Sequence, residues 1–402
     1  MANVSSSNGL EKRPKLRFPG FDEPYRKCRI GDIYAERSQR GAGDMELLSV
    51  TMNGGVMPRS EIEGKDNSSE DKSNYKVVCK GDMVYNSMRM WQGANGVSNY
   101  DGIVSPAYTV LMPTEEIDNQ YFAALFKTSN LINAFRKNSQ GLTSDTWNLK
   151  YPQIRPIRLY IPSLQEQTKI SSFIGMLEER IGKQRQLVAA LKKYKRGVMQ
   201  HIFHRTTTQS VKAWTCVRLG DIFKKVSRRN TDGLVKNVIT NSAEYGLIPQ
   251  RDFFDKDIAV DGNTTNYYVI EKGDFVYNPR KSNTAPYGPF NRYTLDEKGI
   301  ISPLYTCLVL KADIYPSYLA WYFKSDAWHR YIYDNGSQGV RHDRVSMTDD
   351  LLMGIPVIFP DQAKQQEYAD ILDKIEARMQ AAQKVYDLLI KEKCGYMQQL
   401  FI

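Results

Sequence analysis

The sequence predicts an α+β fold arranged as a tandem repeat, in which each copy is a mixed α/β domain followed by one long helix. Two observations predict it. Short blocks of the first half of the 402-residue chain recur in the same order in the second half. Each half also ends in a stretch whose apolar residues alternate at spacings of four and three. Internal repeats of this kind indicate a duplicated architecture.

Five pairs of matching blocks define the repeat. They are Ile30–Ile33 with Leu219–Ile222, Lys80–Asn86 with Lys272–Asn278, Ser105–Thr109 with Ser302–Thr306, Ser139–Gly141 with Ser337–Gly339, and Met199–Phe203 with Met397–Phe401. The offset between matching blocks grows from 189 to 198 residues along the chain. Loop insertions in the second copy would produce this growth, whereas chance would not keep five matches in order.

The first part of each copy, residues 20–160 and 210–358, is rich in Tyr, Gly, Asn and Pro. Short apolar runs alternate there with turn clusters, which predicts short strands joined by long loops. Residues 120–137 and 316–334 have aromatic and Leu residues at three- and four-residue spacing and are predicted to be helical.

The second part of each copy is predicted to be a helix of about 60 Å. Pro162-Ser163 and Pro360-Asp361 are start signals for it. A repeat of 3.5 residues over some five heptads indicates a coiled coil. The predicted seam consists of Ile174, Leu177, Ile181, Val188, Leu191, Leu372, Ile375, Met379, Tyr386 and Leu389. Because a long apolar seam needs a partner, we predict that the two helices pair antiparallel; the alternative is two small domains merely tethered by long helices.

The net charge, the cysteines and the apolar stretches of the sequence indicate which kind of partner and compartment to expect. The net charge is +10 and the isoelectric point is about 9.1, which favours a polyanion such as nucleic acid. The five cysteines are dispersed without a CxxC pair, which argues for a reducing compartment and against disulfides or a zinc site. The chain has no stretch of roughly 18 apolar residues and no apolar signal region near Met1. We therefore expect a cytoplasmic protein without a membrane partner.

No catalytic motif is expected in the chain. Neither a GxGxxG nor a GxxxxGK motif is present. The segment closest to an adenine-methyltransferase loop, Asn278-Pro279-Arg280, lacks the second proline and the aromatic residue. Glu63-Gly64-Lys65 and Glu70-Asp71-Lys72 match the ExK pattern of nucleases, but they lie in a polar loop without an upstream Pro-Asp. We expect no catalytic residue, no metal site and no cofactor in this chain.

Five further motifs follow one another along the chain: Pro14–Phe21, Met90–Ala94, Gly102–Tyr108, Ile161–Ile170 and Leu191–Gln200. In this order, and over the whole chain, they resemble the DNA-specificity (S) subunit of a type I restriction-modification system. The motifs at the start and end of the first long helix, residues 161–170 and 191–200, are the most specific. Residues 360–367, at the start of the second helix, match the family pattern more loosely.

The resemblance implies a non-catalytic subunit with two target-recognition domains that read the two halves of a bipartite site in double-stranded DNA. The paired helices would act as a spacer. Type I methyltransferase subunits would dock on them and carry the S-adenosylmethionine chemistry, and restriction (motor-nuclease) subunits using ATP and Mg would join for phage defence. The implied domains are an N-terminal tail (1–19), the first recognition domain (20–160), the first helix (161–204), a linker with the second recognition domain (205–358) and the second helix (359–402).

DNA recognition needs Arg, Lys, Asn, Gln and Ser side chains on loops that reach base edges. The candidates are Arg59, Arg89, Gln92, Ser139, Gln140, Arg228, Arg229, Lys236, Arg280, Lys281, Asn283, Gln338, Arg341, His342 and Arg344. Of these, Arg228, Arg229 and Lys236 are expected to contact phosphates. Several candidates lie at matching places of the two copies but differ in identity, as two different half-sites require. The alternative for each arginine is a solvated surface charge, and the alternative for the chain is a coiled-coil adaptor protein with two aromatic-rich interaction modules that do not bind DNA.

Overall fold

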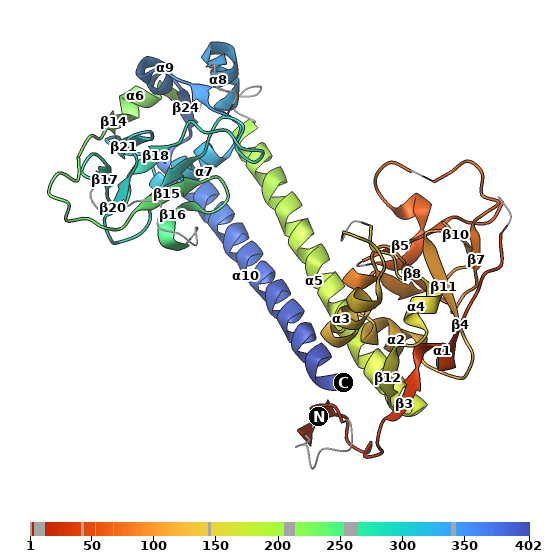
Figure 1. Cartoon of the computed structure of the whole chain (residues 1–402). Helices are drawn as coiled ribbons and strands as arrows, with labels where there is room; N and C mark the ends of the chain where they lie inside the picture. The colour runs from red at the N-terminus through yellow and green to blue at the C-terminus, as the bar shows by residue number, and fades with distance from the viewer. Residues whose placement is uncertain are drawn as a thin grey trace. The chain divides into compact units, whose positions relative to one another are not determined.

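The computed structural model describes residues 2–3, 13–41, 44–52, 54–66, 68–143, 146–204, 214–252, 264–338 and 343–402. The chain divides into two compact units (Figure 1), of which unit 1 is Met1–Gln186 with Lys384–Ile402 and unit 2 is Leu187–Gln383. Each unit holds one α+β module and a segment of both long helices. The predicted fold class is confirmed.

The module of unit 1 is built on a four-stranded antiparallel sheet of order β4-β11-β8-β9. Its strands are β4 (Tyr34–Glu36), β11 (Tyr108–Pro113), β8 (Met83–Asn86) and β9 (Asn95–Val97). The paired strands around it are β1 (Ala2–Asn3) with β2 (Leu16–Arg17), β3 (Arg26–Arg29) with β12 (Arg158–Ile161), β5 (Leu48–Thr51) with β6 (Gly55–Pro58), and β7 (Lys76–Val78) with β10 (Gly102–Val104). The helices are α1 (Ile30–Ile33), η1 (Arg59–Glu61), η2 (Met90–Gln92), α2 (Asn119–Leu125), α3 (Ser129–Asn138) and α4 (Tyr151–Ile154).

The module of unit 2 repeats this plan with the sheet β14-β21-β18-β19. Its strands are β14 (Phe223–Lys225), β21 (Thr306–Leu310), β18 (Phe275–Tyr277) and β19 (Phe290–Arg292). The paired strands are β13 (Thr215–Arg218) with β24 (Pro356–Phe359), β15 (Ile239–Ser242) with β16 (Gly246–Pro249), β17 (Tyr268–Ile270) with β20 (Gly299–Ile301), and β22 (Ser337–Gln338) with β23 (Val345–Ser346). The helices are α6 (Leu219–Ile222), η5 (Gln250–Asp252), α7 (Pro316–Lys324), α8 (His329–Asn335) and α9 (Asp349–Met353).

Each predicted helix of the modules is two helices in the structure. Residues 120–137 split into α2 and α3, and residues 316–334 split into α7 and α8. At the breaks, the hydroxyl of Thr128 donates to the Leu125 carbonyl (2.8 Å) and that of Ser325 donates to the Tyr322 carbonyl (2.6 Å). Such local bonds compete with the helical backbone bonds, so the chain turns there in both copies.

The two long helices, α5 (Leu164–His204) and α10 (Gln362–Leu400), pair antiparallel within each unit. In unit 1, Phe173 packs edge-on against Tyr396, with ring centroids 5.0 Å apart, and Lys393 Nζ lies 2.6 Å from Glu178 Oε1. Of the ten predicted seam residues, three are half-buried (Ile181, Met379 and Tyr386), and seven are buried, namely Ile174, Leu177, Val188, Leu191, Leu372, Ile375 and Leu389.

In unit 2, Val188 and Leu191 of α5 pack with Ala382 and Met379 of α10. Lys195 Nζ lies 2.8 Å from Glu376 Oε2. The lysine that interrupts each apolar seam therefore pairs with a glutamate of the other helix. Within the part of the chain that the structure describes, no helix is both long and apolar enough to cross a membrane.

A buried glutamine near the start of each long helix attaches it to its module. Gln167 Nε2 donates to the Pro162 carbonyl (3.0 Å), and its Oε1 accepts the backbone N–H of Asp118 (3.1 Å). Gln365 makes the same two bonds to Pro360 and Tyr315, both at 2.8 Å. These two glutamines lie at equivalent positions of the repeat but were not among the residues predicted from the sequence.

Candidate nucleic-acid interface

In unit 2, two sequence segments predicted to contact DNA lie side by side at the end of strand β18. Lys281 donates its backbone N–H to the Asp343 carbonyl (2.8 Å), and Val345 donates to the Pro279 carbonyl (2.9 Å). Arg280 and Arg344 form a further antiparallel bridge. The chain after β18 therefore runs beside the β22–β23 hairpin and presents both arginines at one place.

The side chains of Arg280 and Arg344 are partly exposed, and each makes only a long contact with the acidic side chain that they share. The Nε atoms of Arg280 and Arg344 each lie 3.9 Å from Asp343 Oδ2, and the arginine side chains are 69% and 37% exposed. Burial raises the pKa of Tyr305, and a hydrogen bond with Thr240 and the positive charges of the two arginines oppose that rise. Arg280 and Arg344 share the single carboxylate of Asp343, so this surface carries an excess of positive charge. Either guanidinium group could leave Asp343 and bind an anionic or hydrogen-bond-accepting ligand instead.

In unit 1, a loop occupies the matching place in the fold. Gln140 and Asn148 are joined by two backbone hydrogen bonds of 2.9 and 2.8 Å, and Leu149 donates to the carbonyl of Ser87 (2.8 Å), just after strand β8. Ser139 ends helix α3, where its hydroxyl donates to the Phe135 carbonyl (2.8 Å). Residues 140–148 of unit 1 therefore correspond to the β22–β23 hairpin of unit 2.

This loop of unit 1 has aromatic and apolar side chains rather than a cationic pair. Trp147 packs edge-on against Trp91, with centroids 5.2 Å apart, and the Arg136 guanidinium lies 5.6 Å from the centroid of Trp147. Leu142 is fully exposed. Arg89 and Gln92, which flank Trp91 in the sequence, are half-buried. Trp91 belongs to the motif Met90–Ala94, but its packing with Trp147 and the position of Arg136 beside Trp147 were not predicted from the sequence.

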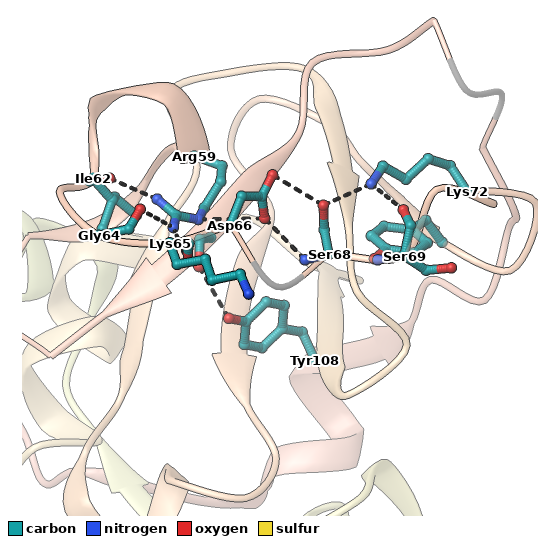
Figure 2. A network of polar contacts seen from close by, with 11 residues as sticks. Arg59, Ile62, Gly64, Lys65, Asp66, Ser68, Ser69, Lys72 and Tyr108 are labelled. Carbon is teal, nitrogen blue, oxygen red and sulfur yellow. Dashed lines mark hydrogen bonds and ion pairs between the residues drawn. The ribbon is translucent and has the colours of Figure 1, made fainter.

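Arg59 holds its own loop together (Figure 2). Its guanidinium donates to the carbonyls of Ile62 (2.6 Å), Gly64 (3.0 Å) and Lys65 (2.7 Å). Its Nε also lies 3.7 Å from Asp66 Oδ1. A base contact by Arg59 would require several of these bonds to break, and its contact with DNA stays a prediction.

Arg228 is likewise occupied within its module. It bonds to the carboxylate of Asp274 (2.6 Å) and to that of Glu271 (3.2 Å). In unit 1, Arg37 and Asp82 form the equivalent pair at 2.7 Å. Each aspartate belongs to the repeated Lys-Gly-Asp motif, so the pair is part of the framework of both modules.

The other candidates of unit 2 differ in their surroundings. Arg229 donates to Asn266 Oδ1 (3.2 Å) and its guanidinium lies 5.6 Å from the centroid of Tyr268. Lys236 and Asn283 are exposed and Lys281 is half-buried. Gln338 is described only in its backbone, within β22, and Arg341 and His342 lie outside the described residues. The described residues contain no group of three or more His, Cys, Asp or Glu that could hold a metal ion.

Solved structures match nearly the whole chain, and two of them are compared with it as follows. One is the crystal structure of a type I restriction-modification system S subunit from M. genitalium, with a TM-score of 0.58 and 14% identity, covering 97% of this chain and 99% of that one. The other is a chain from a structure of complex assembly and conformational transition of a type I restriction-modification system, with a TM-score of 0.57, 16% identity and coverage of 96% and 99%. No family model and no curated protein matches the sequence. The chain therefore has the fold of a type I S subunit, as the sequence motifs led us to expect.

Proposed function

We propose that this chain is the sequence-specific DNA-binding subunit of a type I restriction-modification complex, and that each module reads one half of a bipartite site. One observation carries the proposal: both modules have a loop or hairpin beside the end of the equivalent strand, β8 or β18, but its side chains differ. Equal frameworks with different side chains are what two half-sites of different sequence require. The fold match to an S subunit supports the same function.

The two modules offer different chemistry to DNA. In unit 2, Arg280 and Arg344 can each turn from Asp343 to the O6 and N7 atoms of a guanine in the major groove. In unit 1, Leu142 and the paired rings of Trp91 and Trp147 suit apolar contact with a thymine methyl group.

We expect Arg344→Ala and Arg280→Ala each to weaken binding to the specific site by about 1–3 kcal/mol while changing binding to unrelated DNA much less, because a base contact carries sequence information and a phosphate contact does not. Fluorescence anisotropy at two salt concentrations measures this. Lys272→Ala is the matched control, since Lys272 is exposed and paired with Asp296. Equal losses on specific and unrelated DNA would assign the arginines to phosphate contacts instead.

Partner subunits would dock on the long helices. Besides the buried seam, α5 and α10 expose apolar side chains, namely Met176, Leu187, Tyr194, Ile371, Val385, Leu388 and Ile390. Met176, Val385, Leu388 and Ile390 belong to unit 1, and Leu187, Tyr194 and Ile371 belong to unit 2. Exposed apolar side chains on a long helix are candidate contacts for a partner protein. We infer that they bind methyltransferase subunits, which restriction subunits then join. S-adenosylmethionine, ATP and Mg would be bound by those partners, and this chain would determine which DNA sequence the complex recognises.

The variants Met176→Asp and Leu388→Asp are expected to reduce copurification with the partner methyltransferase at least tenfold, because each places a charge in an apolar interface. Gln186→Asp, an exposed position of the same helix α5, is the control. Retention of the methyltransferase by both aspartate variants would show that docking uses another surface.

A further inference from the structure

The two units differ in the side chains that fill the contact between the module and the two long helices. In unit 2, Trp321 of α7 is only 4% exposed, and its Nε1 donates to Asp373 Oδ1 of α10 at 2.8 Å. The ammonium groups of Lys324 and Lys195 lie 4.7 and 5.8 Å from the centroid of this ring. The indole is thus buried between two cations and tied to one carboxylate.

The charged residues around this position recur in unit 1. Lys127, Glu178 and Lys393 are the counterparts of Lys324, Glu376 and Lys195 at offsets of 197 and 198 residues. Each glutamate pairs with the lysine of the other helix, at 2.6 Å in unit 1 and 2.8 Å in unit 2.

The electrostatic surroundings of the module lysines also correspond. Burial lowers the pKa of Lys127, with Glu178 opposing and Lys393 adding to the effect. Burial likewise lowers the pKa of Lys324, with Glu376 opposing and Lys195 adding to the effect. The cations and the glutamate therefore have equivalent arrangements in the two units.

The aromatic ring and its carboxylate partner do not recur. The counterpart of Trp321 is Ala124, and that of Asp373 is Gly175. Unit 1 has a cavity of about 740 Å³ here, and its lining includes Ala124, Gly175 and the three charged residues Lys127, Glu178 and Lys393. A Cβ atom added to Gly175 would meet no atom within 4 Å. The space that unit 2 fills with an indole is therefore open in unit 1.

We propose that this cavity of unit 1 binds a small planar aromatic molecule, whose ring takes the position that Trp321 occupies in unit 2. The volume lies within the usual range for small-molecule sites, about 300–1,000 Å³. Lys127 and Lys393 provide cations for the faces of the ring, and Ile174, Met397 and Phe401 provide apolar walls. Because the two lysines outnumber the one glutamate, a ligand with an anionic substituent is preferred over a cationic one.

Calorimetric titration of the full chain tests this with three probes: indole, the anion indole-3-acetate and the cation tryptamine. We expect one saturable site, with indole-3-acetate binding most tightly and tryptamine most weakly. The double variant Ala124→Trp with Gly175→Asp introduces into unit 1 the tryptophan and aspartate that unit 2 has at these positions. Because the new indole side chain would fill the cavity, this variant should bind indole at least tenfold more weakly. Lys127→Met keeps the cavity but removes one cation, which should weaken indole binding about two- to fivefold.

The converse variant, Trp321→Ala with Asp373→Gly, should raise the number of indole sites from one to two. Three outcomes would overturn the proposal. The wild-type chain could show no saturable indole binding, the variant Ala124→Trp with Gly175→Asp could bind indole as tightly as the wild type, or that variant could unfold. The last result would mean that the cavity cannot accept an indole.

Discussion

Exchange of residues 215–359 for the matching segment of a related chain is expected to change one half-site of the recognised DNA completely and to leave the other unchanged. The segment begins with β13 and ends with β24, which pair antiparallel from Thr215 with Phe359 to Arg218 with Pro356. Both ends of the exchanged segment therefore lie together, and the module between them keeps its own sheet and the smaller core around Ile239 and Val276. Its larger core also includes Ile202, Phe203, Ala369 and Leu372 of the long helices, which the chimera retains. Methylation sequencing of cells that carry the chimera measures the outcome.

The mirror exchange is the matched control. Residues 26–161 of the first module begin with β3 and end with β12, which pair in the same way, so this exchange should alter only the other half-site. A folded chimera that has lost both half-sites would contradict the modular reading of DNA, because it would mean that the two modules read the site jointly.

Arg17→Ala is expected to lower the free energy of unfolding by about 3–5 kcal/mol, since it leaves the carboxylate of Glu166 buried without its cation. Arg17 binds both oxygens of Glu166, at 2.8 and 2.7 Å, and the two side chains are only 5% and 1% exposed. Tyr25 adds a hydroxyl contact to the same carboxylate at 3.4 Å. Urea denaturation of the purified chain measures the loss.

Two further variants separate the ion pair from other effects of substitution. Arg26→Ala removes an exposed pair with Glu115, whose side chains are 55% and 38% exposed, and should cost less than about 1 kcal/mol. The double change Arg17→Met with Glu166→Met removes both buried charges and should restore most of the stability. If Arg17→Ala costs no more than Arg26→Ala, the buried pair does not stabilise the start of α5.

The repeat and the helix pair could be predicted because their signals are spread over many residues. The alternation of apolar residues from Ile174 to Leu191, with its copy from Leu372 to Leu389, defines a helical seam regardless of the rest of the fold. The lysine in each seam, Lys195 or Lys393, was visible in the pattern, but its partner glutamate on the other helix could be found only once the register was known.

The side chains proposed to contact DNA could be predicted from the sequence only as a set of candidates. Arg59 and Arg228 look like exposed arginines in the sequence, yet backbone carbonyls hold the first and carboxylates hold the second. A sequence does not show whether the donors of a guanidinium are already bonded within the fold. Arg280 and Arg344 are far apart along the chain, and an isolated backbone bridge between them brings them together.

The cavity of unit 1 corresponds to two differences between the repeats in the sequence. Ala124 stands where the second copy has Trp321, and Gly175 stands where it has Asp373. These are two ordinary differences until the structure shows that Trp321 and Asp373 bond to each other. Only then does their joint replacement indicate an open space.

Methylation sequencing of cells that express this chain with its partner methyltransferase tests the central claim most directly. We expect one methylated motif made of two different specified half-sites, separated by a gap of unspecified bases. An uninterrupted motif, or the same motif in cells without this chain, would contradict the claim that its two modules determine the sequence that is recognised.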